Sequence, residues 1–184
     1  MNAPQPLLSD ALLLDLPAFT DHRGSFFECS GAAAFEGLPS DTRFVRSGWC
    51  SNPRARTLRG LHGQWGLGKL VSVVCGEAYD VIVDVRPGSP TYGGWEAALL
   101  SGTHGQSLWV PPGFAHGYMT LKADTTVLYQ FTAPHVRARE FGVLYSDPQL
   151  AISWPGLPQC MSDRDRQLPG LPPAGAVRAS PQSG

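Results

Sequence analysis

Short runs of alternating hydrophobic and polar residues follow one another along the middle of the chain. Residues 79–85, YDVIVDV, show the alternation most clearly. A period of two residues is typical of β-strands, whose side chains point alternately to the two faces of a sheet. The same reasoning predicts strands at residues 11–16, 70–74, 78–85, 95–100, 107–110, 117–121 and 125–131. Turns rich in Gly and Pro separate these runs, so we expect a meander of antiparallel strands in an all-β sandwich or barrel.

The two ends of the chain lack this pattern. Residues 1–9 read as a loose N-terminal arm, and residues 169–184, rich in Pro, Ala, Ser and Gly, as a flexible C-terminal tail. Between them, residues 21–28 predict a turn that runs into a strand, and residues 31–35 one short helical turn. We therefore expect a single domain over residues 1–168, including the arm, followed by the tail.

Composition narrows the class of protein. The 184 residues carry a formal net charge of -1 with no long run of like charge, so we expect neither a nucleic acid nor a membrane as partner. The four cysteines, at positions 29, 50, 75 and 160, form no CxxC pair, and we interpret them as free thiols in a reducing cytoplasm. No segment approaches about 18 uninterrupted apolar residues, which predicts no membrane span.

The first candidate for chemistry is the segment RGLHGQ at residues 59–64. It places a cation, Arg59, three residues before the imidazole of His62, and a second cation, Lys69, follows. In an extended chain Leu61 would face away while His62 points into a cavity. The competing interpretation is a surface histidine in a basic turn.

A second histidine follows a turn of the form Pro-x-Gly-x-x-His. Pro111, Gly113 and His116 have the spacing of the second half of a cupin signature, in which a turn delivers a histidine into the mouth of a β-barrel. Metal-binding cupins also need two further histidines and a carboxylate, because a divalent ion in an open site wants at least three protein ligands. This chain offers only His62 in the equivalent place, with Lys69 nearby, so we predict no metal.

Taken together, the motifs resemble those of the dTDP-4-dehydrorhamnose 3,5-epimerase family, a metal-free branch of the cupins. The similar segments occur in one order at residues 21–28 (DHRGSFFE), 59–62 (RGLH), 69–71 (KLV), 83–86 (VDVR), 89–93 (SPTYG), 109–117 (WVPPGFAHG), 129 (Y), 146–148 (SDP), 152–155 (ISWP) and 162–165 (SDRD). The resemblance implies a cupin-type jelly-roll β-barrel with short peripheral helices, a homodimer, no cofactor, and a nucleotide-diphosphate sugar as substrate.

The resemblance also assigns the proton chemistry to four residues. It implies that His62 is the general base, that Asp165 orients it, that Tyr129 donates a proton on the opposite face of the sugar ring, and that Lys69 lies near the C4 oxygen. By the same resemblance five residues bind the substrate: Arg59 the diphosphate, Arg23, Phe26 and Glu28 the nucleotide across a dimer interface, and His116 the sugar.

Independently of the resemblance, these residue types suit the chemistry of epimerisation. Epimerisation next to a ketone removes an acidic α-proton, stabilises an enolate and returns a proton to the other face. An imidazole with a carboxylate on its far nitrogen is suited to the first step, and an ammonium group aimed at the developing oxyanion is suited to the second. Taken singly, Tyr129 could be an ordinary barrel aromatic and Asp165 a helix-capping acid.

Some positions depart from the family pattern. The family carries a Gln-x-Asn pair before the base histidine, where an ungapped reading of this chain gives Ser47 and Trp49. It has an aromatic residue after that histidine, where this chain has Gly63, and often Lys after the tyrosine, where this chain has Gln130. A large Trp49 in the sugar pocket would restrict the second of two inversions, so inversion at C3, C5 or both stays open.

Three other functions remain open. A nucleotide-sugar 3,4-ketoisomerase also moves protons next to a carbonyl in a cupin barrel, but the RGLH, Tyr129 and Asp165 set favours the epimerase. A metal-dependent cupin oxygenase lacks its ligands here. A sugar-binding cupin that kept the pocket without turnover is the non-enzyme alternative.

Overall fold

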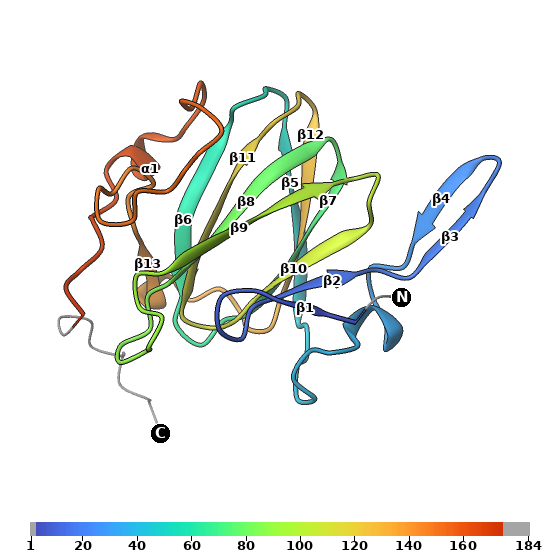
Figure 1. The fold of residues 1–184 in the computed structure, drawn as a ribbon, viewed down its shortest axis with the longest axis horizontal. Coiled ribbons are helices and arrows are strands. Elements are labelled where there is room, and N and C mark those ends of the chain that lie inside the picture. The colour runs from blue at the N-terminus through green and yellow to red at the C-terminus, as the bar shows by residue number, and fades with distance from the viewer. Residues whose placement is uncertain (1–2, 175–184) are drawn as a thin grey trace.

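The protein is almost entirely β-sheet (Figure 1) in a computed structural model that describes residues 3–174. The strands and short helices, in chain order, are β1 (Gln5–Pro6), β2 (Leu12–Asp15), β3 (Ala18–Asp21), β4 (Gly24–Phe27), η1 (Ala33–Phe35), β5 (Arg46–Asn52), β6 (Leu58–Gln64), β7 (Lys69–Cys75), β8 (Glu77–Asp84), β9 (Trp95–Ser101), β10 (Gln106–Val110), β11 (Phe114–Thr120), β12 (Thr125–Phe131), η2 (Arg137–Arg139), β13 (Glu140–Gly142) and α1 (Asp163–Arg166). No helix in the described part of the chain is long and apolar enough to cross a membrane.

Two antiparallel sheets form the barrel. One has the strand order β1-β2-β10-β7-β12-β5 and the other β13-β6-β11-β8-β9. From β5 onwards consecutive strands alternate between the sheets, except that β8 and β9 share one, and this connectivity makes a jelly roll. The predicted cupin-type jelly-roll β-barrel with short peripheral helices is confirmed. The expected meander is wrong, because alternation identifies a strand without specifying its neighbour.

Strand β8 lies between β11 and β9 in its sheet and is buried on both faces. Val81 and Val83 point to one face and pack in a cluster with Leu61 and Ala115. Ile82 points to the other face and packs inside the barrel in a cluster that includes Val71, Phe114 and Val127. A strand buried on both faces is covered by packing partners on each side, which anchors its neighbour β11, and β11 in turn pairs with β6, the strand that carries His62.

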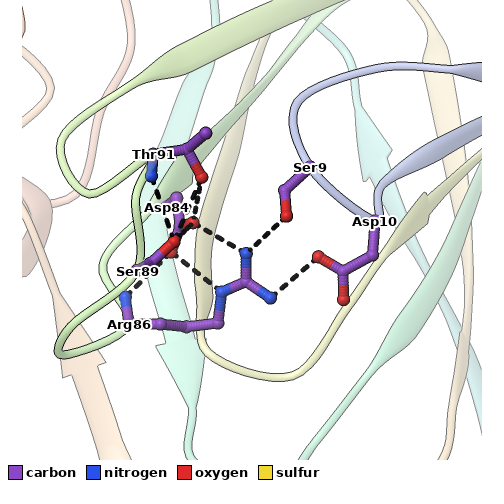
Figure 2. Close-up of polar contacts among 6 residues, drawn as sticks. All are labelled: Ser9, Asp10, Asp84, Arg86, Ser89 and Thr91. Carbon is purple, nitrogen blue, oxygen red and sulfur yellow. Dashed lines mark hydrogen bonds and ion pairs between the residues drawn. The ribbon is translucent and has the colours of Figure 1, made fainter.

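The N-terminal segment is more ordered than the loose arm that its sequence predicts. Strand β1 pairs with β2, and Leu7 and Leu8 pack against the core. Arg86 holds the segment in place, because its Nη1 donates to Asp10 Oδ1 at 2.8 Å and its Nη2 to Ser9 Oγ at 3.0 Å (Figure 2). The expectation of a loose arm is therefore wrong from residue 5 onwards.

The same arginine is anchored by a buried carboxylate. Asp84 is fully buried and accepts hydrogen bonds from Arg86, Ser89 and Thr91 (Figure 2). Burial acts to raise the pKa of Asp84, but these hydrogen bonds outweigh it and hold the pKa at about 2. The motifs VDVR and SPTYG are thus joined in one structural cluster away from the catalytic candidates.

The flexible tail predicted from residue 169 is wrong for residues 169–172. The Leu171 side chain is buried in a core cluster, and its N–H donates to Asp147 Oδ2 at 2.6 Å. The Pro172 carbonyl accepts from the Tyr92 hydroxyl at 2.6 Å. Residues 169–172 therefore pack on the barrel, and the remainder of the expected tail from residue 175 lies outside the described residues.

Strands β3 and β4 form a hairpin that projects from the barrel on the side away from α1 (Figure 1). This confirms the predicted turn and strand in residues 21–28. Phe19 and Phe26 are strand partners in this hairpin and are 65% and 64% exposed, with ring centroids 6.2 Å apart. Two large aromatic side chains are thus left in solvent on a two-stranded ribbon, which by itself is marginally stable.

Candidate active site

A pocket of about 530 Å³ opens where β5, β6 and β12 meet the segment around α1. It is lined by Gly48, Trp49, Cys50, Thr57, Leu58, Arg59, His62, Tyr129, Phe131, Cys160, Met161, Ser162, Arg164 and Asp165. A smaller pocket of about 260 Å³ adjoins it, sharing His62, Phe131 and Arg164, and adds Lys69 to the lining. The fold thus brings all four predicted catalytic residues to two adjoining pockets.

His62 and Asp165 form a dyad although they are 103 residues apart in sequence. The Nε2 atom of His62 lies 2.9 Å from Asp165 Oδ1, and Gly60 N–H donates to Asp165 Oδ2 at 3.1 Å. Because a carboxylate only accepts, Nε2 carries the hydrogen and Nδ1 is left as the basic nitrogen. The helix cap is Ser162, whose side chain accepts from Asp165 N–H. The alternative of Asp165 as the capping acid is therefore wrong.

The protonation state of His62 suits a base. Burial lowers its pKa below the ordinary value, and the positive charges of Arg164 and Lys69 lower it further, while Asp165 opposes them. A neutral imidazole at pH 7 can accept a proton, and Asp165 can then stabilise the imidazolium.

Lys69 is a buried cation beside this dyad. Its Nζ donates to the His62 backbone carbonyl at 3.2 Å. Burial lowers the pKa of Lys69 to about 8, with Asp80 opposing the shift. The ammonium is therefore mostly charged at neutral pH and close to its titration range.

Tyr129 stands in the wall of the pocket on β12. It pairs with Gly48 of β5, and its ring stacks on Phe131 at 5.6 Å with an interplanar angle of 7°. Burial, and then the adjacent Tyr118 and Cys50 side chains, raise the pKa of Tyr129 well above its ordinary value. The phenol is therefore protonated at neutral pH, as a proton donor must be.

Trp49 lines the pocket, but the register between β5 and β12 does not make it the strand partner of Tyr129. Gly48 is the partner of Tyr129, whereas Trp49 is the partner of Leu128 and is 74% exposed. Neighbouring strand residues face opposite sides, so the position beside Tyr129 belongs to Gly48. A Cβ added at Gly48 would meet nothing within 4 Å. The pocket is therefore open beside Gly48, although Trp49 is among the residues that line it.

The structure places His116 behind the pocket and not in its lining. His116 is buried and its Nε2 lies 2.7 Å from Asp80 Oδ1. Its ring meets the Tyr129 ring edge-on at 6.0 Å. The expected direct contact of His116 with the sugar is therefore not supported, because Tyr129 stands on its outer side and the pocket lining omits it.

The predicted nucleotide-binding residues are not at the pocket. Arg23 and Phe26 lie on the projecting β3–β4 hairpin, and Glu28 follows it directly. None of the three lines either pocket beside His62. Arg59, by contrast, lines the larger pocket as predicted.

Several residues of the site were missed from the sequence. Asp80 is the buried partner of His116, and its signal was a carboxylate within an apolar strand. Asn52 bonds Arg59, and Arg46 places its guanidinium carbon 4.0 Å above the Phe131 ring. The segment at 46–52 has no apolar alternation, so only its pairing with β12 reveals it as the strand β5.

Two glycines next to the base show why the RGLHG segment has its sequence. Gly60 has φ +122°, and a Cβ there would lie 2.6 Å from the Gly117 Cα on β11. At Gly63 a Cβ would overlap the ring of Phe141, which occupies that space from β13. The two strands and this ring approach β6 closely only because both positions lack a side chain.

Within residues 3–174 no group of three or more His, Cys, Asp and Glu side chains is arranged to hold a metal ion. The absence of a metal from the purified protein stays a prediction. All four thiols are free, as predicted, whereas the reducing cytoplasm stays a prediction.

Comparison with known proteins identifies the family. The family description "dTDP-4-dehydrorhamnose 3,5-epimerase" matches residues 6–172. A dTDP-4-dehydrorhamnose 3,5-epimerase of Sinorhizobium fredii is 40% identical over 168 residues, covering 89% of this chain and 86% of that protein. A crystal structure of the Bacillus anthracis enzyme with TDP and PPi bound has a TM-score of 0.85 and 39% identity, over 91% of this chain and 97% of that one.

A third similar protein, ChmJ, is a 3'-monoepimerase from Streptomyces bikiniensis that was crystallised with dTDP-quinovose. It has a TM-score of 0.83 and 30% identity, over 90% of this chain and 86% of that one. The order of motifs, the jelly-roll topology and these matches agree, and the chain belongs to the dTDP-4-dehydrorhamnose 3,5-epimerase family.

Proposed function

We propose that this protein epimerises a nucleotide-linked 4-keto-6-deoxy sugar, with dTDP-4-dehydro-6-deoxyglucose as the substrate. The observation that carries the proposal is one pocket with a histidine–aspartate base in one wall and a protonated tyrosine in another. Family membership supports the substrate class, since the similar enzymes are dTDP-sugar epimerases. The reaction needs no cofactor, because proton removal and return are its only steps.

In the proposed reaction His62 removes the proton from a carbon next to the C4 carbonyl. Asp165 holds the ring tautomer and stabilises the imidazolium that forms. Lys69 supplies positive charge for the enolate oxygen, a contribution that in similar sites is worth about 3 kcal/mol. Its burial supports this role, because a charge in a dry site interacts more strongly than one in water.

Tyr129 then returns a proton to the opposite face of the ring. Its raised pKa keeps the phenol protonated until the enolate forms. Its fixed place, between the stacked Phe131 ring and the edge of His116, supports a donor held in one orientation. His116 has the role of backing Tyr129 in this proposal, and the sugar contacts Tyr129 itself.

We propose further that the active unit is a homodimer in which each hairpin serves the pocket of the other subunit. Arg23, Phe26 and Glu28 would then bind the nucleotide, and Arg59 the diphosphate. The exposed Phe19 and Phe26 rings on a projecting ribbon support a covered interface. A cytoplasmic location fits the four free thiols and a nucleotide-sugar substrate.

Mixed dimers test the shared site. Neither Arg23→Ala nor His62→Ala homodimers should turn over well, but a mixed dimer of the two variants assembles one pocket with an intact base and an intact hairpin. We expect activity to return in the mixed dimer. If mixing restores nothing, each hairpin does not serve the other subunit's pocket.

The function itself is tested by proton NMR in heavy water with dTDP-4-dehydro-6-deoxyglucose. Deuterium at C3 and C5 with inversion at both centres indicates a double epimerase, and label with inversion at one centre a monoepimerase. A product with its carbonyl at C3 would indicate a 3,4-ketoisomerase instead. Binding of the nucleotide sugar without deuterium exchange would indicate a sugar-binding protein that has no turnover.

A further inference from the structure

Asn52 is a fully buried polar side chain that none of the steps above uses. It is the last residue of β5, and it lies between Arg59 of β6 and Tyr118 of β11. A buried amide requires hydrogen-bond partners for both its oxygen and its nitrogen, so its partners show what it holds in place.

The nitrogen of the amide fixes its orientation. Asn52 Nδ2 donates to the Thr125 carbonyl at 2.9 Å and to the Cys50 carbonyl at 3.3 Å. The oxygen Oδ1 accepts from Arg59 Nε at 2.8 Å and from the Tyr118 hydroxyl at 3.2 Å. A flipped amide would set oxygen against two carbonyls and nitrogen against a guanidinium, so only this orientation satisfies every group.

The first consequence concerns Arg59. Its Nε is held by Asn52, while its terminal amino groups make no hydrogen bond within residues 3–174. The side chain is exposed in the larger pocket. A guanidinium fixed at Nε presents its terminal N–H groups in one plane, which is the arrangement that binds a phosphate oxygen pair.

The second consequence concerns the proton donor. The rings of Tyr118 and Tyr129 both lie beside His116, with centroid distances of 6.5 and 6.0 Å. By accepting from the Tyr118 hydroxyl, Asn52 holds the immediate neighbour of Tyr129. One oxygen atom therefore connects the side chain that faces the diphosphate with the group beside the proton donor.

We propose that Asn52 is a positioning residue, whose amide oxygen aims Arg59 at the substrate diphosphate and holds Tyr118 beside Tyr129. The inference rests on the proposed function, because it needs a diphosphate in the pocket. It goes beyond that function in assigning a residue that touches no substrate.

Calorimetric titration with TDP tests the link to Arg59. We expect Asn52→Ala to weaken TDP binding roughly tenfold, the scale of a lost hydrogen bond to a charged group. In an Arg59→Ala background the same substitution should have no further effect, since its partner is gone. Asn52→Ser, whose hydroxyl is too short to reach Arg59, serves as a second variant if the alanine protein does not fold.

Ser107→Ala provides the matched control. Ser107 is also fully buried in the six-stranded sheet, and its hydroxyl bonds Ser72 Oγ at 2.6 Å, away from the pocket. We expect this variant to lose thermal stability while it keeps the wild-type TDP affinity. A merely structural role for Asn52 would make its variants behave in the same way.

The outcomes separate this inference from the proposed function. If wild-type protein binds TDP and Arg59→Ala weakens binding, but both Asn52 variants bind as tightly as wild type, only the role of Asn52 is overturned. An equal loss from Asn52→Ala with and without Arg59 also overturns it. A wild-type protein that binds no TDP would overturn the proposed function and this inference with it.

Discussion

The barrel holds two histidine–aspartate pairs that differ mainly in what covers them. His62 on β6 and His116 on β11 are direct partners across the strand pair. Each presents Nε2 to a carboxylate, at 2.9 Å in His62–Asp165 and 2.7 Å in His116–Asp80. The His62 side chain is 36% exposed, whereas that of His116 is 3% exposed.

The difference shows that access to the pocket, and not residue type, distinguishes the proposed catalytic pair from the structural pair. Burial lowers the pKa of both histidines, and a carboxylate opposes the shift in both. Only His62 lines the pockets, so only this dyad can exchange a proton with a bound molecule. His116 belongs to the more recognisable sequence motif, yet it lies behind Tyr129.

Of the two histidines, removal of the partly exposed His62 should have the larger effect on turnover. We expect His62→Ala to lower kcat by about 10³-fold, because the variant lacks the imidazole that is proposed to accept the proton. Solvent deuterium incorporation measures this loss, with TDP affinity as the control for an intact pocket. Wild-type exchange in the purified variant would remove His62 as the base.

Removal of the buried His116 should instead lower the stability of the folded protein. His116→Ala leaves the fully buried Asp80 without its hydrogen-bonded partner, at a cost of about 3 kcal/mol in unfolding free energy. Urea unfolding measures the difference, and we expect His62→Ala to lose less than about 1 kcal/mol because its side chain is partly exposed. Equal losses from the two variants would contradict the comparison.

The pH profile of kcat should show how the two pairs are coupled through Lys69. The proposed reaction needs neutral His62 and charged Lys69, so activity should fall as pH drops through the lowered pKa of His62 and as pH rises through about 8. Asp80 acts to raise the pKa of Lys69, so Asp80→Asn should move the alkaline limb to lower pH. If the alkaline limb stays where it is in Asp80→Asn, ionisation of Lys69 does not determine it.

Removal of metal ions by chelation should have no effect on activity. Each histidine directs Nε2 to its own carboxylate, and the two do not form a shared ligand set within the described residues. We therefore expect full activity after exhaustive EDTA treatment, with elemental analysis of the purified protein as the companion measurement. One equivalent of metal per chain, lost together with activity, would favour the oxygenase alternative.

The sequence by itself determined the class of fold and the chemical groups of the site. Alternation in residues 78–85 and the Gly-rich and Pro-rich turns predict strands, because the period of two is a local property of the extended backbone. The ordered motifs predict the family and place His62, Lys69, Tyr129 and Asp165 in one site. The structure brings these four residues to two adjoining pockets.

Only the tertiary structure decided what each group faces. His62 and Asp165 meet across 103 positions, and Gly48 is the strand partner of Tyr129, whereas Trp49 is the partner of Leu128. Strand register and pairing between distant strands set these relations, and a shift of one residue reverses the face of every side chain. The local pattern of apolar and polar residues carries no information on that register. The burial of His116 and the projection of the β3–β4 hairpin are therefore decided by tertiary packing.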